Sequence, residues 1–139
     1  MEENTNNAEN EVVKASTSEY TKEDKEKNKV MAILSYLGIL AFVAYFVGAK
    51  DSKWVKFHAV QGVNLAIVSL GAMIVLNVLN IVFAIIFSGV LETLFGLVLT
   101  LLIGAVGLGT FVFMLLGILN VLKGEAKKLP LISKIKILK

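Results

Sequence analysis

The sequence predicts an all-α integral membrane protein: a bundle of three transmembrane helices with a disordered N-terminal tail. Its composition is too apolar for a soluble domain of this size, and its charges avoid long stretches that could each cross a bilayer. Hydrophobic residues make up 56% of the 139 residues, and the mean hydropathy is +0.75. Soluble domains average about 45–50% apolar residues, because polar surface must cover their cores.

Charge and residue usage exclude several functional classes. Residues 1–29 carry eight acidic residues and five Lys, whereas residues 30–139 carry nine Lys and three acidic residues. The chain has no Arg, so it lacks the guanidinium fork that binds phosphate bidentately, and we expect no nucleic-acid binding. The chain also has no Cys, which excludes disulfides and thiolate metal sites.

Residues 1–27 are predicted to form a disordered polar tail, and residues 28–139 the membrane domain. The tail has too little apolar surface to offset the entropy cost of ordering it. Near its end, Thr21 can cap a helix, because Asp24 follows at the third helical position. The charged residues after Thr21 form either a helical approach to the membrane or a solvated linker.

The first uncharged run covers residues 30–49 and lies between two lysines. A helix of this length spans about 30 Å, which is the thickness of the hydrocarbon core of a bilayer. We therefore predict a transmembrane helix over these residues. A short polar link follows, in which Asp51 or Ser52 can cap the next helix.

Two further apolar runs hold His58 as their only titratable residue. We predict long, tilted helices over residues 54–87 and 92–122, with the break at Ser88-Gly89. An alternative cuts the same residues into three spans, giving four in all. It would place Glu92 near the middle of the membrane, where an unpaired carboxylate is costly, so three spans are favoured.

The lysine distribution predicts the orientation. With three spans, the first link and the C-terminal tail share one side with nine Lys, and the N-terminal tail and the 88–92 turn share the other with five. Cytoplasmic segments carry the excess of Lys and Arg. We therefore expect a multi-pass protein of the cell membrane with a cytoplasmic C-terminus and an external N-terminal tail. Beyond Pro130, the tail is expected to lie on the membrane surface.

Candidate functional residues gather in the link and in the tail. His58, Gln61 and Asn64 recur on one side of a helix, where they either line a polar seam or hold the helix to its neighbours. A lone His without carboxylate or thiol neighbours builds neither a metal site nor a catalytic centre, so we assign no catalytic, cofactor or metal site and expect no enzyme. The candidate interaction surface comprises Lys53, Trp54, Lys56, His58, Gln61, Asn64, Lys134 and Lys136.

The expected partners of this surface are the lipid bilayer with its anionic headgroups, or a docking membrane protein. Each Lys near an anionic leaflet contributes about 1 kcal/mol. Small residues at helical spacing, such as Gly38, Ala41 and Ala44, favour close packing of the three helices. The same ridges also permit a homo-oligomer.

Three segments together resemble a known family: Ala32-Ile33-Leu34-Ser35-Tyr36-Leu37-Gly38, Phe57-His58-Ala59-Val60-Gln61-Gly62 and Gly124-Glu125-Ala126-Lys127-Lys128-Leu129-Pro130-Leu131-Ile132. Their order and spacing are similar to the Tic20-like family, small bacterial and archaeal relatives of the plastid inner-envelope protein-import subunit. The resemblance covers residues 28–139 and implies three spans and a link to protein insertion or translocation. It carries over no catalytic residue. The plastid members have a further span that this chain lacks.

The sequence thus favours a non-enzymatic membrane binding or assembly module. The alternative is a small channel or transporter formed by an oligomer. The first is favoured because no polar track crosses a span: Asn77 and Asn80 lie well round the helix from Gln61 and Asn64. Separate interhelical hydrogen bonds are expected for these two asparagines.

Overall fold

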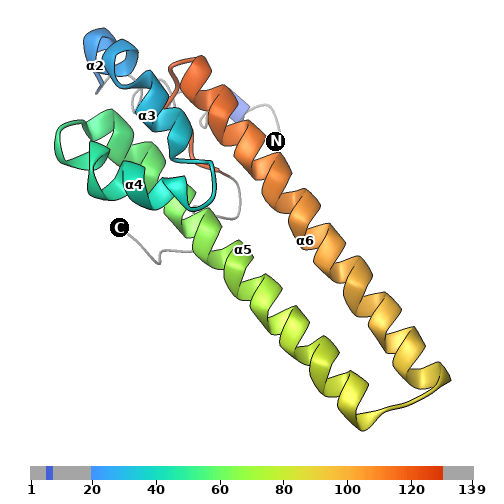
Figure 1. Ribbon diagram of the computed structural model, residues 1–139. Helices are drawn as coiled ribbons and strands as arrows, with labels where there is room; N and C mark the ends of the chain where they lie inside the picture. The colour runs from blue at the N-terminus through green and yellow to red at the C-terminus, as the bar shows by residue number, and fades with distance from the viewer. Residues whose placement is uncertain (1–5, 8–19, 130–139) are drawn as a thin grey trace. The chain divides into compact units, whose positions relative to one another are not determined.

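The computed structural model of the chain describes residues 6–7 and 20–129, and every element in these ranges is helical (Figure 1). The order is α2 (Lys22–Lys27), α3 (Lys29–Leu34), α4 (Leu40–Phe46), the 3-10 helix η1 (Gly48–Lys50), α5 (Lys53–Ile86) and α6 (Val90–Leu122). The predicted all-α class is confirmed for the described residues. The surface segment expected after Pro130 lies outside them.

The chain divides into two compact units. Unit 1 comprises Met1–Ala66 and Phe113–Lys139, and unit 2 comprises Ile67–Val112. Helices α5 and α6 each contribute residues to both units.

Two of the three expected long helices are present. Helices α5 and α6 have 34 and 33 residues with a hydropathy of 2.4 each, so both are long and apolar enough to cross a membrane. Neither helix is interrupted, so the cuts that a four-span arrangement requires are not seen. Of the two candidate caps of α5, Ser52 serves: its Oγ accepts a hydrogen bond from the Val55 amide at 3.1 Å.

The third expected helix, over residues 30–49, is not a continuous helix. It is broken into α3, α4 and η1, and between α3 and α4 Gly38 adopts a left-handed φ of 57°. Glycine reaches this conformation without the steric penalty of a Cβ atom, and such a residue ends helices. With six and seven residues, α3 and α4 are each about 10 Å long, a third of a bilayer core. A single transmembrane helix over these residues is therefore not confirmed.

Helix α2 covers the charged residues after Thr21, for which the sequence left a helical approach or a solvated linker open. Thr21 caps this helix as expected, because its Oγ1 accepts a hydrogen bond from the Asp24 amide at 3.1 Å. Acidic residues follow in the first turn and lysines in the last, which suits the helix dipole.

Unit 1 holds the tightest helix contacts. A Cβ atom at Gly62 on α5 would overlap the backbone carbonyl of Ser35, and one at Gly117 on α6 would overlap the ring of Tyr36. The turn between α3 and α4 can therefore lie directly against both long helices. The apolar core around Tyr36 consists of Ala32, Tyr36, Trp54, Leu65, Val121, Ala126 and Leu129.

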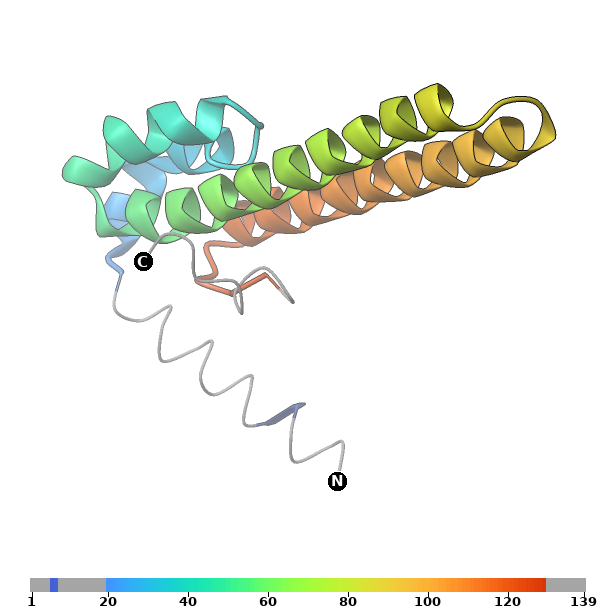
Figure 2. The ribbon, with the colours of Figure 1, turned by 90° about the horizontal axis from the view of Figure 1, so that it is seen from below.

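Unit 2 is a hairpin of two antiparallel helices, which run side by side in both ribbon views (Figures 1 and 2). Gly89 has a φ of 71° in the connecting turn. Near this turn Phe83 stacks on Phe95, with ring centroids 4.8 Å apart. Asn77 donates to the Met73 carbonyl of its own helix at 2.7 Å, which differs from the interhelical bond expected for it.

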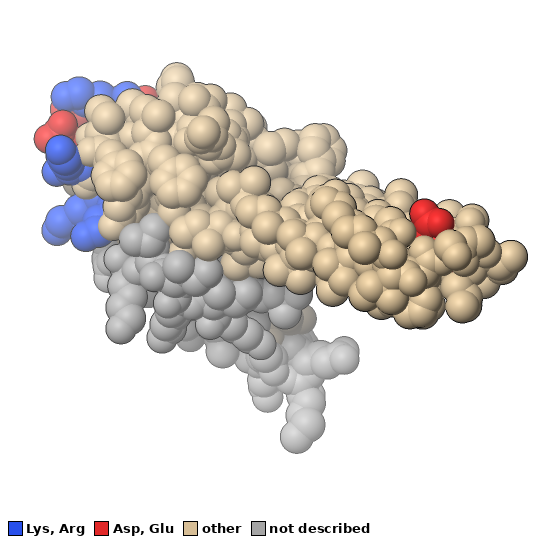
Figure 3. Space-filling model, turned by 60° about the horizontal axis from the view of Figure 1, so that its bottom comes forward, with Lys and Arg blue, Asp and Glu red and all other residues tan. Residues whose placement is uncertain are grey.

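The surface of unit 2 is apolar. Large aliphatic side chains point outward from both helices, as shown by exposed fractions of 62% for Ile74, 78% for Ile85 and 66% for Leu101. Glu92 is the only charged residue in the unit, and Figure 3 shows one acidic patch on an otherwise uncharged surface there. Helices that are apolar on all sides belong in a core or in lipid. Because these side chains are not in a core, the chain is a small membrane protein.

Candidate functional site

A buried polar cluster forms where the first turns of α5 meet the turn after α3. Tyr36 Oη and His58 Nδ1 lie 2.8 Å apart, and both side chains are almost completely buried. Two further rings surround the imidazole, with centroid distances of 4.3 Å to Trp54 and 5.1 Å to Phe57. The histidine is thus an interior residue, held by one hydrogen bond and packed among aromatic rings.

Gln61 joins this cluster to the segment that follows α6. Its Oε1 accepts a hydrogen bond from the backbone amide of Leu129 at 2.6 Å, and Leu129 is fully buried. A buried amide outside regular secondary structure needs such an acceptor, because an unpaired one is costly. Gln61 therefore satisfies the backbone of a segment 68 residues away in the sequence.

Three side-chain nitrogens of this region have no hydrogen-bond partner in the described part of the chain: Trp54 Nε1, His58 Nε2 and Gln61 Nε2. Their residues recur at i, i+4 and i+7 along α5 and so share one face. A phenol–imidazole pair without a carboxylate offers no oriented acid–base relay. In the described ranges, moreover, no three His, Cys, Asp or Glu side chains gather into a metal-binding group.

The structure separates the predicted interaction residues into two groups. Lys53 and Lys56 are exposed on the first turns of α5. Four others lie inside unit 1, because α5 is packed on several sides there: Trp54, His58, Gln61 and Asn64. Lys134 and Lys136 lie outside the described residues. Among the candidates that the structure describes, only Lys53 and Lys56 are exposed.

A second contact fixes α2 against the start of α5. Asp24 Oδ1 accepts a hydrogen bond from Ser52 Oγ at 2.6 Å, and Asp24 Oδ2 accepts one from the Trp54 amide at 3.4 Å. The ring of Tyr20 packs edge-on against the Trp54 indole, with ring centroids 5.4 Å apart. Lys25 Nζ lies 5.3 Å from the Trp54 ring centroid, within the range of a cation–π interaction. From the sequence, Asp24 was expected to act only locally, in the cap formed with Thr21.

The lysines that the structure describes all lie in unit 1, in the segments around this contact. We call them the lysine-rich cap: Lys22, Lys25, Lys27, Lys29, Lys50, Lys53, Lys56, Lys123, Lys127 and Lys128. Five acidic residues share these segments: Glu23, Asp24, Glu26, Asp51 and Glu125. Figure 3 shows lysines gathered with a few acidic residues on this unit. The cap thus carries an excess of positive charge.

Comparison with known proteins assigns the chain to a different family from the one its motifs suggested. Residues 27–138 match the magnetosome magnetite crystal formation protein family. The magnetosome protein MmsF of Paramagnetospirillum magneticum is 35% identical over 107 residues, covering 77% of this chain and 83% of the relative. The magnetosome protein MamF of Magnetospirillum gryphiswaldense is 32% identical over 109 residues, covering 78% and 82%.

An archaeal protein matches equally well. A membrane protein of the UPF0132 group from Methanocaldococcus jannaschii is 32% identical over 110 residues, covering 79% of this chain and 84% of the relative. No solved structure matches the chain.

These matches correct the resemblance to the Tic20-like family, which was wrong, and they give no support to the link with translocation. The segments that suggested it are those that pack unit 1. Tyr36 contacts His58, Gly62 lies against the Ser35 carbonyl, and Gln61 binds the Leu129 amide. Their pattern therefore reflects how this unit folds.

Proposed function

Because the chain belongs to the magnetosome magnetite crystal formation protein family, we propose that it is a non-enzymatic membrane protein that assembles other proteins at a membrane. Two of its relatives are named as magnetosome proteins, and the archaeal one only as a membrane protein. Any role that these proteins share must be carried out in a membrane. The observation that carries the proposal is the apolar exterior of unit 2.

Unit 2 serves as the membrane anchor. Its part of α5 runs over residues 67–86 and its part of α6 over residues 90–112. At 1.5 Å per residue these 20 and 23 residues give lengths of about 30 and 35 Å, which fit a hydrocarbon core. Two polar side chains of this stretch bind within their own helices, since Asn77 and Thr110 both donate to carbonyls one turn earlier.

The lysine-rich cap serves as the surface that meets partners. Its excess of lysines favours anionic lipid headgroups, and its exposed side chains also offer contacts to another membrane protein. The positive-inside rule supports a cytoplasmic position for the C-terminal segment, which holds six Lys from Lys123 onward. The protein is thus proposed to act at the cytoplasmic face of its membrane.

The buried polar cluster serves the fold in this proposal. Tyr36 and His58 pair with each other, and Gln61 pairs with a backbone amide. None of the three is exposed to a substrate. The family description refers to crystal formation. In this proposal the protein contributes to it by organising other membrane proteins and not by binding mineral directly.

Crosslinking in native membranes, followed by identification of the captured proteins, tests the assembly role. We expect specific membrane-protein partners whose yield falls when Lys53 and Lys56 are replaced by Gln. The matched control is the Asn77→Gln variant, which alters a polar residue of unit 2. Ion or solute flux into liposomes that contain the purified protein would instead favour the oligomeric channel or transporter. Turnover of a substrate that is lost in the His58→Ala variant would contradict the non-enzymatic role.

A further inference from the structure

The contact between Asp24 and Ser52 bears on how many times the chain crosses the membrane. Asp24 precedes the apolar stretch of residues 30–49, and Ser52 follows it. If that stretch crossed the bilayer, its two ends would lie about 30 Å apart, on opposite sides of the hydrocarbon core. The two side chains are instead joined by a hydrogen bond of 2.6 Å. The two ends of the stretch are therefore neighbours.

Further contacts in unit 1 support the same arrangement. Tyr20 and Lys25, both ahead of the stretch, pack on the indole of Trp54, which follows it. Lys25 also approaches the segment after α6, since its Cδ lies 3.7 Å from the position that a Cβ atom on Gly124 would occupy. The segments before α3, before α5 and after α6 thus meet in one place.

The helices between these ends suit a segment that turns back without crossing the bilayer. Gly38 reverses the chain after α3, and α4 then buries Ala41 and Ala44 while it exposes Val43 and Phe46. Small side chains thus face the protein and large apolar ones face outward.

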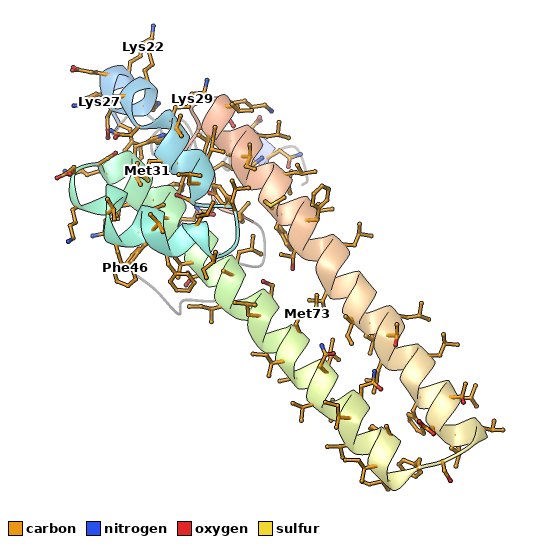
Figure 4. All side chains as sticks on the ribbon, in the orientation of Figure 1. Lys22, Lys27, Lys29, Met31, Phe46 and Met73 are labelled. Carbon is orange, nitrogen blue, oxygen red and sulfur yellow. The ribbon has the colours of Figure 1, made fainter. Side chains whose placement is uncertain are left out.

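Figure 4 shows the lysines at the start of unit 1's apolar stretch: the labelled Lys22, Lys27 and Lys29 lie at α2 and the start of α3. Lys50 stands at the other end of the stretch, four residues after Phe46. Lysines thus flank residues 30–49 on both sides, as expected when both ends lie at headgroup level.

We infer that residues 30–49 form a hairpin that turns back on the cytoplasmic side without crossing the bilayer, and that the lysine-rich cap is one continuous surface on the anionic headgroups of the cytoplasmic leaflet. This inference rests on the proposed function in one respect, the embedding of unit 2 in the bilayer. The chain then crosses the membrane twice, through α5 and α6. The turn of this hairpin lies against Gly62 and Gly117, which stand just outside the residues of α5 and α6 that are proposed to span the hydrocarbon core.

The lysine count agrees with two crossings better than with three. All 14 Lys lie outside residues 57–122, so two crossings place all of them on one side and none on the other. Three crossings divide them nine to five. Since the positive-inside rule acts on this asymmetry, two crossings place both chain termini in the cytoplasm. Three crossings would place the N-terminal tail outside, whereas two crossings place it on the same side as the C-terminus.

Single-cysteine labelling tests the inference directly, because the chain has no Cys. The variants are Glu23→Cys, Ser88→Cys and Lys127→Cys, all at exposed positions, treated with a membrane-impermeant maleimide in intact cells and after permeabilisation. We expect Ser88→Cys to react in intact cells, and the other two only after permeabilisation.

Different failures have different meanings. If Glu23→Cys reacts together with Ser88→Cys while Lys127→Cys stays protected, the chain crosses three times and the inference is overturned, although the proposed membrane protein stands. If Lys127→Cys alone reacts in intact cells, both the inference and the cytoplasmic orientation fail. If all three sites behave alike, whether they react in intact cells or only after permeabilisation, unit 2 does not span the membrane and the proposed function fails as well.

A proximity experiment gives an independent reading of the same contact. The pair Asp24→Cys and Ser52→Cys is expected to form a disulfide, or to accept a short thiol crosslinker, in native membranes. The matched pair Asp24→Cys and Ser88→Cys should not react. Crosslinking of the second pair without the first would overturn the inference.

The lipid part is tested with Glu23→Cys carrying an environment-sensitive fluorophore, in proteoliposomes of phosphatidylcholine with or without one-third phosphatidylglycerol. We expect a blue shift only with the anionic lipid, reversed by 1 M salt because surface charge is then screened. Identical spectra in both compositions would overturn the assignment of the cap to anionic headgroups.

Discussion

Replacing Gly62 by Ala is expected to destabilise unit 1, because the new methyl group meets backbone and not a flexible side chain. A Cβ atom built at this position overlaps the carbonyl of Ser35. That carbonyl belongs to the residue that ends α3, immediately before Tyr36 enters the core. Relief of the overlap therefore requires the turn after α3 to move away from α5.

The size of the effect follows from two opposing terms. Forcing an extra methyl group into a close-packed contact costs about 1–3 kcal/mol, and a rigid neighbour favours the upper end. Replacing a helical glycine by alanine returns at most about 1 kcal/mol of helix propensity. The net expectation is a loss of about 2 kcal/mol in the free energy of unfolding.

Gly71→Ala is the matched control, because it lies on the same helix and its Cβ atom would have nothing within 4 Å. Gly71→Ala should gain about 1 kcal/mol of helix propensity without any steric overlap. The free energies of unfolding of the two variants should therefore differ by about 3 kcal/mol. Denaturant unfolding in detergent can be followed by the fluorescence of Trp54, the only tryptophan, which is buried in unit 1. If Gly62→Ala is as stable as Gly71→Ala, the close approach of the turn to α5 is refuted.

Three further predictions concern the polar cluster and the lysine-rich cap. Tyr36→Phe leaves the buried imidazole without its phenol partner and should lower the free energy of unfolding by about 1 kcal/mol, whereas Tyr45→Phe should change it by less than half as much; equal effects would contradict the pairing. Gln61→Leu removes the acceptor of the Leu129 amide and should cost about 1–3 kcal/mol, with faster hydrogen exchange at that amide; unchanged exchange would argue against this bond. Lys53→Gln should weaken the retention of anionic lipid on the purified protein about fivefold, as measured by lipid phosphorus analysis, and an unaltered lipid content would count against its place in the cap.

The sequence by itself determined the elements that depend on local pattern. Long runs without charge predict long apolar helices, because lipid-facing helices cannot carry unpaired charge, and α5 and α6 follow that pattern. Thr21 and Ser52 act as the predicted helix caps, since capping involves atoms only three residues apart. The turn at Ser88-Gly89 also matches, because glycine next to a polar residue interrupts the apolar run.

Only the tertiary structure decided the path of residues 30–49 and the roles of the polar residues around them. An apolar run has the same composition whether it crosses a bilayer or turns back, and a single glycine at position 38 gives no local sign that its φ will be positive. The partners of His58, Gln61 and Asp24 lie 22, 68 and 28 residues away, beyond any helical periodicity. Hydrogen bonds over such separations depend on which backbones approach closely, and here that approach is permitted by glycines at positions 62 and 117 that have no Cβ atom to prevent it.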